Sequence, residues 1–243
     1  MSPPIEIRGL VRRYGDIEAV RDLSLDIPAG EVFGLLGPNG AGKSTTLKVL
    51  GTLLRPTSGS VRLAGYDVVA EPDEVRRRIG YVPEAAELYD ALTGFEFLDL
   101  LADLHALDPS VAAARRTPLL ESFGLLADAE RPIGDYSKGM RQKLLLTAAL
   151  QHDPEILLLD EPLDGLDVAA QERLKEILRA HVASGRAVVY SSHILEVVER
   201  LCDRVAIIHR GRLVALGAPA ELLAAHPGRT LPQVFLELTG AGG

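Results

Sequence analysis

The sequence predicts an α/β fold: an N-terminal antiparallel β region, then a core of alternating strands and helices into which an α-helical subdomain is inserted. Three observations predict it. Residues 5–27 show partial alternation of apolar and polar side chains, which is typical of half-buried strands. Short apolar runs alternate with helical stretches on either side of the middle of the chain. Between Leu92 and Gly124, helix signals occur with almost no strand signal.

The elements of the core follow from short apolar runs and the turn residues between them. The β region 5–27 breaks at Gly15 and Asp16, and a Pro-Ala-Gly turn follows it. We then expect a strand over 31–36, a helix over 43–54 that the segment 55–59 ends, and strands over 61–63 and 79–82. Later come a buried strand over 156–159, a helix over 168–183, a strand over 187–190, a helix over 194–202 and a hairpin of 205–208 and 213–215.

Helix signals define the subdomain and the tail. Thr93 and Glu96 form a capping box that opens a helix over 95–107. Asp108 and Pro109 open a second helix, which Gly124 ends, and a third covers 137–152. Two short helices are expected over 219–226 and 232–239. We therefore divide a single domain, 1–243, into a core (1–84 and 151–217), a helical subdomain (about 85–150) and a helical tail (218–243).

The composition is that of a globular protein. Of the 243 residues, 47% are hydrophobic and 25% are charged, which excludes a disordered or fibrous chain. The net charge is −8, from 26 Lys and Arg against 34 Asp and Glu. An acidic surface is poorly suited to nonspecific phosphate binding, so we expect no nucleic-acid partner. The single cysteine, Cys202, excludes an intrachain disulfide and a cysteine-cluster metal site.

The chain carries no sequence signal for secretion or membrane insertion. Its N-terminus lacks a basic-then-apolar signal pattern, and no apolar stretch approaches the ~18 residues of a membrane helix. We expect a soluble, cytoplasmic chain that reaches a membrane only through a partner.

A glycine-rich segment stands between the strand 31–36 and the helix that begins at Lys43. It matches the P-loop pattern and consists of Gly37, Pro38, Asn39, Gly40, Ala41, Gly42, Lys43 and Ser44, with Thr45 next. The glycines let backbone N–H groups turn inward around phosphate oxygens, and the helix adds its positive N-terminal end. Lys43 can reach the β- and γ-phosphates, and the Ser44 hydroxyl can ligate Mg²⁺. The motif therefore predicts a site for a nucleoside triphosphate and Mg²⁺.

Two carboxylates end the buried strand 156–159. Asp160 is placed near the metal, and Glu161, one residue beyond, can orient and deprotonate the attacking water. Together with the P-loop, this pair predicts hydrolysis of the bound nucleotide.

The segment 136–142, Tyr-Ser-Lys-Gly-Met-Arg-Gln, resembles the signature sequence of ATP-binding cassette (ABC) ATPases. In that family, the segment of one subunit binds the γ-phosphate held by the P-loop of a second subunit. The resemblance assigns this role to Ser137, Lys138 and Gly139. Lys138 stands where the family usually has a glycine; its side chain either strengthens the attraction for phosphate or points to solvent, and we favour solvent.

Further segments extend the resemblance over approximately residues 5–240. Tyr14 matches the aromatic residue that stacks on adenine, and His193 matches the histidine that touches the γ-phosphate. The segment 163–167, which ends at Asp167, matches a loop that crosses the dimer interface, with Asp164 where a serine is common. Glu84 replaces a glutamine that binds Mg²⁺, and a carboxylate remains a suitable ligand.

The resemblance implies an ATP-binding and ATP-hydrolysing subunit of an ABC transporter, at the cytoplasmic face of the membrane. Two such chains, identical or close paralogues, would enclose two Mg-ATP and drive a separate integral membrane permease. Arg76, Arg77 and Arg78 are expected at the surface, near the loop that faces membrane partners in the family. Glu84, the signature and the tail 233–239 resemble those of bacterial exporters, so export is the expected direction.

Two alternatives remain open. A soluble ABC ATPase that acts on nucleic acid or the ribosome usually has two cassettes or a long coiled coil, and this sequence has one P-loop and no sustained heptad pattern. A P-loop kinase or GTPase would have no use for the signature, and no Asn-Lys-x-Asp segment for guanine recognition occurs.

Overall fold

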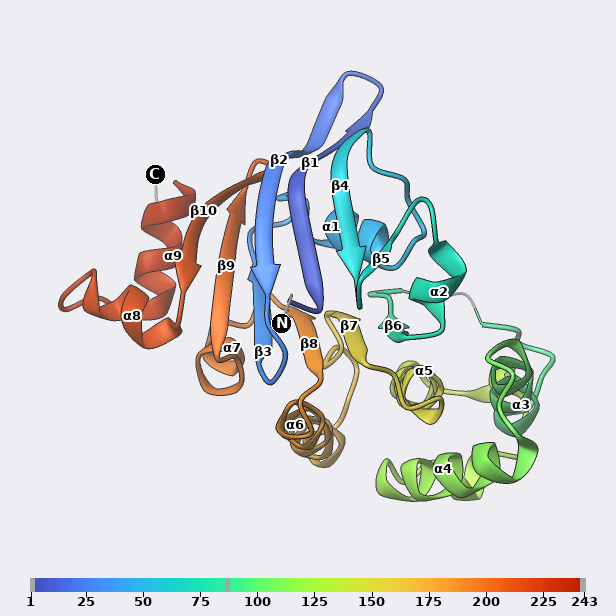
Figure 1. Cartoon of the computed structure of the whole chain (residues 1–243). Helices are drawn as coiled ribbons and strands as arrows, with labels where there is room; N and C mark the ends of the chain where they lie inside the picture. Colours follow the sequence, from blue (N-terminus) through green and yellow to red (C-terminus); the bar gives the residue numbers. More distant parts are fainter. Residues whose placement is uncertain (1–2, 86–87, 241–243) are drawn as a thin grey trace.

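Two β-sheets organise the chain in the computed structural model, which describes residues 3–85 and 88–240 (Figure 1). The strands are β1 (Ile5–Tyr14), β2 (Ile17–Ile27), β3 (Val32–Leu36), β4 (Ser58–Leu63), β5 (Tyr66–Asp67), β6 (Ile79–Val82), β7 (Ile156–Asp160), β8 (Ala187–Ser191), β9 (Arg204–His209) and β10 (Arg212–Gly217). A four-stranded antiparallel sheet has the order β2-β1-β4-β5, and a six-stranded sheet has the order β10-β9-β3-β8-β7-β6. The predicted α/β class and the antiparallel N-terminal region are confirmed.

The helices surround the six-stranded sheet. They are α1 (Lys43–Leu50), α2 (Pro72–Arg76), α3 (Gly94–Leu104), α4 (Pro109–Ser122), α5 (Lys138–Gln151), α6 (Val168–Ala183), α7 (Leu195–Leu201), α8 (Pro219–Ala224) and α9 (Leu231–Thr239). Helices α3 and α4 lie beyond β6, and α8 and α9 lie at the opposite end, beside β10 (Figure 1). None of the helices in the described ranges is long and apolar enough to cross a membrane.

The middle of the six-stranded sheet is parallel and buried on both faces. β7 shows why: Ile156 and Leu158 face the four-stranded sheet, whereas Leu157 and Leu159 face the helices on the other side. A continuous apolar run gives a strand that both faces of the sheet can bury. β7 extends one residue past the prediction and so includes Asp160. The carboxyl ends of these strands, where Asp160 and Glu161 lie, are the usual location of ligand sites in parallel sheets.

The three helices α3, α4 and α5 share a separate apolar cluster, to which Leu98, Leu120 and Leu144 contribute. Thr93 caps α3 with the predicted capping box, in which its hydroxyl accepts from the Glu96 N–H and the Glu96 carboxylate accepts from the Thr93 N–H. The limits of the helical subdomain, about 85–150, stay a prediction, as does the division of the chain into core and tail.

Two helices end three or more residues earlier than predicted. α1 ends at Leu50 instead of residue 54, because Gly51 caps it and Thr52 adopts a left-handed backbone with φ +61°. α3 ends at Leu104 instead of residue 107, and Ala106 is likewise left-handed, with φ +53°. The short elements β5 and α2 were not predicted, since two and five residues give too little periodicity.

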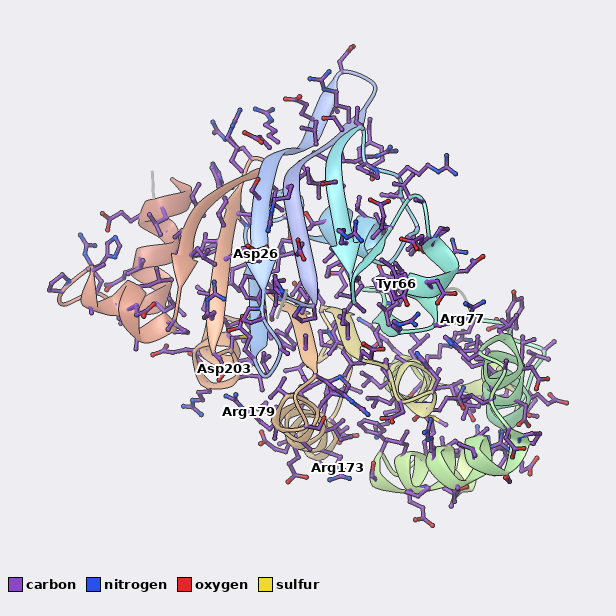
Figure 2. All side chains as sticks on the ribbon, viewed as in Figure 1. Asp26, Tyr66, Arg77, Arg173, Arg179 and Asp203 are labelled. Carbon is purple, nitrogen blue, oxygen red and sulfur yellow. The ribbon has the colours of Figure 1, made fainter. Side chains whose placement is uncertain are left out.

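The C-terminal elements are fixed to the core. β9 and β10 form the predicted antiparallel hairpin, which turns at Arg210 and Gly211. Arg179 of α6 pairs with Asp203, just before β9, at 2.8 Å from Nη1 to Oδ1 (Figure 2). Asp203 also accepts a hydrogen bond from the Val32 N–H, so one carboxylate connects a helix to two neighbouring strands.

Candidate functional site

A pocket of about 330 Å³ lies over the start of α1. It is lined by Ala19, Asn39, Gly40, Ala41, Gly42, Lys43, Ser44, Thr45, Glu84 and Glu161. Gly42 has φ +108°, and a Cβ there would lie 2.4 Å from the Ala19 carbonyl oxygen, so only glycine fits. Lys43 Nζ donates to the carbonyls of Gly37 and Pro38, at 2.8 and 3.4 Å. The P-loop thus presents backbone N–H groups, a lysine and two hydroxyls to one cavity, which suits a polyphosphate.

Asp160 is the last residue of β7, and Glu161, which follows it, lines this pocket. Asp160 is 1% exposed, and its Oδ1 accepts a hydrogen bond of 2.5 Å from the Ser191 hydroxyl. Glu161 is left-handed, with φ +49°, and its side chain lines the pocket. The turn of the backbone between them directs the second carboxylate into the cavity while the first stays within the sheet.

His193 is paired with Glu161. The distance from His193 Nδ1 to Glu161 Oε2 is 2.9 Å, and the His193 backbone N–H also points at Oε2, at 3.4 Å. The imidazole is 65% exposed, whereas the carboxylate is 12% exposed. The exposed imidazole therefore lies beside the carboxylate that can act as a base, although His193 does not itself line the pocket.

The donor set of the pocket fits Mg²⁺. Ser44 and Glu84 supply a hydroxyl and a carboxylate on its wall, and Asp160, which does not line it, directly precedes Glu161, which does. Within residues 3–85 and 88–240, no group of three or more His, Cys, Asp or Glu side chains is arranged to hold a metal by itself. Mg²⁺ commonly takes one or two carboxylates together with substrate phosphates, so this sparse set of hard oxygen donors suits it.

The signature segment lies at the start of α5 and is joined to the loop that follows Glu161. Ser137 is the N-cap and accepts a hydrogen bond from the Met140 N–H at 3.2 Å. A Cβ at Gly139 would lie 2.6 Å from the Gly165 carbonyl oxygen, so the two backbones are in close contact. Buried Gln142 donates to the Pro162 carbonyl at 3.1 Å. The segment and the loop therefore form one packed unit.

Two ion pairs also connect α5 to the loop. Lys138 Nζ lies 2.6 Å from Asp164 Oδ2, and Lys143 Nζ lies 2.6 Å from Asp167 Oδ2. The hydrogen bond from Lys138 lowers the pKa of Asp164, and the hydrogen bond from Lys143 lowers the pKa of Asp167. Lys138 is 70% exposed, as expected for a side chain directed at solvent, but its ammonium has an acidic partner that the sequence analysis did not anticipate.

Some of the expected site residues lie apart from the pocket. Among the residues that the structure describes, Ser137, Lys138, Gly139 and Asp167 do not line it. Neither does Tyr14, which ends β1, is 44% exposed and has the Arg12 guanidinium carbon 4.7 Å from its ring centre. Gly37, Pro38, Asp160 and His193 also lie outside the lining of the pocket, although Asp160 directly precedes Glu161 and His193 is paired with it. One chain therefore brings the rest of the P-loop, Glu84 and Glu161 to one pocket, which the signature residues do not line.

Sequence reasoning missed two residues at the site. Ala19 of β2 forms part of the pocket wall, and Ser191 binds Asp160. No sequence signal marks Ser191, because its bond to Asp160 depends on the parallel register of β7 and β8. No sequence signal marks Ala19, since its contact depends on how the two sheets pack.

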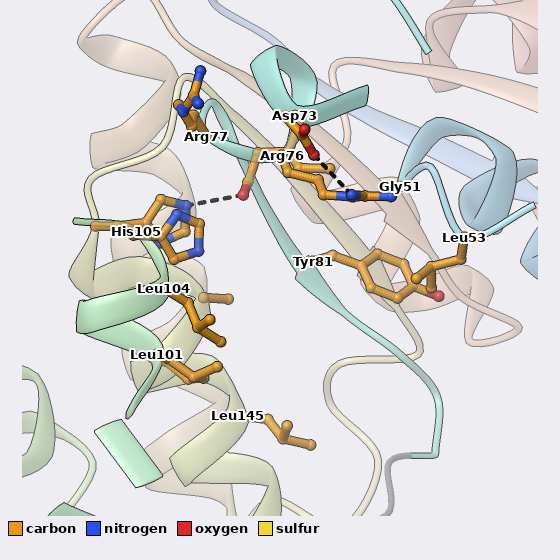
Figure 3. Close-up of a pocket in the computed structure, with 14 residues that line it drawn as sticks. Gly51, Leu53, Asp73, Arg76, Arg77, Tyr81, Leu101, Leu104, His105 and Leu145 are labelled. Carbon is orange, nitrogen blue, oxygen red and sulfur yellow. Dashed lines mark hydrogen bonds and ion pairs between the residues drawn. The ribbon is translucent and has the colours of Figure 1, made fainter. Parts of the chain in front are cut away.

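A second cavity, a groove of about 560 Å³, lies where α3 and α5 meet the core (Figure 3). Apolar side chains, among them Leu53, Leu101, Leu104 and Tyr81, form much of it, and Arg76 and Arg77 lie at its edge (Figure 3). Two histidines, His105 and His152, line it as a stacked pair with ring centres 3.8 Å apart. Arg76 pairs with Asp73, which also lines the groove, and Arg77 pairs with Glu74, so the groove carries an apolar surface with ion pairs beside it.

Comparison with known proteins agrees with this geometry. Residues 20–164 match the profile of the family described as ABC transporter. The chain is 43% identical to the daunorubicin/doxorubicin resistance ATP-binding protein DrrA of Streptomyces peucetius over 90% of its length and 66%, just under two thirds, of that protein. It is 39% identical to the Nod factor export ATP-binding protein I of Burkholderia orbicola, over 96% of this chain and 76% of that one.

Solved structures show the same fold. The ATP-binding subunit of an ABC transporter superposes with a TM-score of 0.91 at 34% identity, covering 96% of this chain and 98% of that one. A dimeric ATP-binding cassette in a post-hydrolysis state, bound to ADP and phosphate, superposes with a TM-score of 0.80 at 25% identity, over 88% of this chain and 98% of that one. The chain belongs to the ABC transporter family, as an ATP-binding cassette that hydrolyses ATP.

Proposed function

We propose that the chain powers export across a membrane, as the ATPase subunit of a transporter whose membrane-spanning part is a separate protein. Relatives named for drug resistance and for Nod factor export support this direction. Nothing in the described ranges favours the alternative of a soluble ATPase that acts on nucleic acid or the ribosome. The chain would be bound peripherally, at the cytoplasmic face of the membrane.

One observation carries the proposal of a dimer: the pocket of one chain lacks the signature residues. Ser137, Lys138 and Gly139 stand on a surface of their own, joined to Glu161 by the loop that ends at Asp167. In the proposed dimer they complete the pocket of the partner subunit, with Ser137 and the Gly139 N–H at a helix N-terminus facing the γ-phosphate. The dimeric form of the related cassette bound to ADP and phosphate supports this arrangement.

Within each proposed site, the position of each residue determines its role. Tyr14 would stack on adenine, the segment 37–45 would surround the phosphates, and Ser44, Glu84 and Asp160 would hold Mg²⁺, which would withdraw charge from the phosphate oxygens. Glu161 takes a proton from the attacking water. His193, held beside Glu161, contacts the γ-phosphate. ATP would favour the closed dimer because its γ-phosphate contacts both halves only when they meet.

The groove between α3, α5 and the core is the proposed docking site for the membrane subunit. Its apolar wall suits an apolar helix face, and the ion pairs Arg76–Asp73 and Arg77–Glu74 beside it offer charges of both signs to polar side chains on such a helix, since complementary charges orient partners. Co-purification of the co-expressed membrane subunit tests this. Leu104→Asp should reduce the amount captured, whereas Val111→Asp, an exposed change on α4 outside the groove, should not.

Light scattering with Mg-ATP tests the dimer. Glu161→Gln should bind ATP and accumulate a dimer, because closure needs ATP and opening needs hydrolysis. Adding Ser137→Glu to that variant places a negative charge against the partner's γ-phosphate and should restore the monomer. A Glu161→Gln protein that stays monomeric with bound Mg-ATP would contradict the proposal.

A further inference from the structure

Ser191 joins the two carboxylates of the site. It is the last residue of β8, paired in parallel register with Asp160, the last residue of β7. Its side chain is fully buried, and its hydroxyl donates to Asp160 Oδ1 at 2.5 Å. Its hydroxyl and its carbonyl oxygen each lie 3.3 Å from the Glu161 N–H. A single residue on the neighbouring strand therefore binds the side chain of one carboxylate residue and the backbone of the other.

The contacts of Ser191 with Asp160 and with the Glu161 backbone each have a physical reason. Asp160 is almost fully buried, and a buried carboxylate requires hydrogen-bond donors. Glu161 has a positive φ, which is uncommon outside glycine and persists where neighbouring groups fix it. Without the Ser191 hydroxyl, Asp160 would lose its donor on the neighbouring strand and could rotate away from the metal.

We propose that Ser191 is a positioning residue for Mg²⁺-dependent hydrolysis: it orients the Asp160 carboxylate and holds the backbone turn that aims Glu161 into the pocket. This rests on the proposed function, which assigns Asp160 to Mg²⁺ and Glu161 to water. Groups that orient metal ligands from behind typically change metal affinity or activity by about 10–100-fold when removed.

The test compares nucleotide affinity with and without metal. Calorimetry with a non-hydrolysable ATP analogue, once with excess Mg²⁺ and once with EDTA, gives the gain in affinity that Mg²⁺ provides. Ser191→Ala should reduce that gain by about tenfold or more and leave the affinity in EDTA unchanged. Ser191→Thr keeps the hydroxyl and should restore most of the gain. In steady-state ATP hydrolysis by Ser191→Ala, kcat should fall by a larger factor than the factor by which KM for ATP changes.

Thr147→Val is the matched control, because Thr147 is a fully buried hydroxyl that donates to the Lys143 carbonyl within α5, away from the pocket. Thr147→Val should keep the full gain in nucleotide affinity that Mg²⁺ provides. If Ser191→Ala fails to fold, Ser191→Cys, which retains the volume with a weak donor, should show the loss instead. The inference would be overturned if the folded variant, Ser191→Ala or Ser191→Cys, kept the full gain in nucleotide affinity from Mg²⁺. It would also be overturned if Thr147→Val lost as much of that gain as the Ser191 variant. A wild-type protein with no Mg²⁺ gain would refute the assignment of Asp160 and the proposed function with it.

Discussion

His193 Nδ1 lies 2.9 Å from Glu161 Oε2, so the imidazole and the carboxylate of the site are in direct contact. The two residues follow adjacent strands, β8 and β7, and the His193 N–H points at the same oxygen. The contact fixes the direction of a carboxylate whose backbone is already constrained by its positive φ. A base must be within hydrogen-bond reach of the proton that it takes, so its direction matters as much as its basicity.

His193→Ala should therefore lower kcat for ATP hydrolysis by about a hundredfold, a typical size for the loss of one group in proton transfer. ATP binding should change little, because the P-loop supplies most of the phosphate contacts. Turnover and equilibrium binding of ATP measure the two effects separately. His226→Ala, two residues after the last residue of α8, is the control and should behave as wild type. Equal turnover in His193→Ala and wild type would remove His193 from the mechanism.

The sequence predicts most of the core because its signals are local. The buried strand at 156–159, the capping box at Thr93 and the P-loop before Lys43 each depend on residues a few positions apart. The helix predicted to residue 54 was wrong at its end because Gly51 stops it earlier than the proline-containing segment does. Helix ends depend on single residues and are harder to predict than helix interiors.

The sequence does not predict which group each charged side chain contacts. Lys138 and Asp164 are 26 residues apart, and their contact depends on the packing of Gly139 against Gly165. The contact of Ser191 is likewise not predictable from the sequence, because its bond to Asp160 depends on the register of two strands. The roles of Tyr14 and of the signature residues stay predictions, since they depend on nucleotide and on a second chain.

Glu84→Gln should raise the Mg²⁺ concentration that gives half-maximal hydrolysis. A carboxylate binds a hard cation more strongly than an amide does, and a difference of ~1 kcal/mol corresponds to about fivefold. A Mg²⁺ titration of ATPase activity at fixed ATP measures the shift. Glu121→Gln, on α4 and outside the pocket, should leave the profile in place. Overlapping curves for Glu84→Gln and wild type would mean that Glu84 does not bind the metal.

The pair of Lys138 and Asp164 should matter for dimer formation and little for stability. Both side chains are more than half exposed, and such ion pairs typically contribute less than about 1 kcal/mol. Lys138→Ala and Asp164→Asn should therefore have melting temperatures close to wild type. In the Glu161→Gln background with Mg-ATP, Lys138→Ala should weaken the dimer, whereas Asp164→Asn should strengthen it by releasing the ammonium toward the partner's nucleotide. If both substitutions weaken the dimer equally, the Lys138–Asp164 pair affects only the conformation of the loop.

His152 lies in the groove as the inner partner of a stacked pair. Its ring packs on His105, and its Nε2 lies 2.9 Å from the Ile79 carbonyl oxygen, so this nitrogen carries the proton of the neutral ring. Burial, followed by the charge of His105, lowers the pKa of His152 from 6.5 to about 4. Burial also lowers the pKa of His105. The folded protein thus resists protonation of both rings, whereas the unfolded chain accepts it.

Stability should consequently decline as the pH falls from 6.5 toward 4. The pKa of His152 is lower in the folded state, so its contribution is complete above 6.5 and disappears as the pH approaches 4, by at most roughly 3 kcal/mol. His181, with a pKa lowered to about 4 by burial, adds to the same decline. His152→Gln cannot take up this proton and should lose less stability than wild type over that interval, in denaturant unfolding at each pH. His226→Gln should keep the full slope, and a His152→Gln protein with that same slope would contradict the assignment.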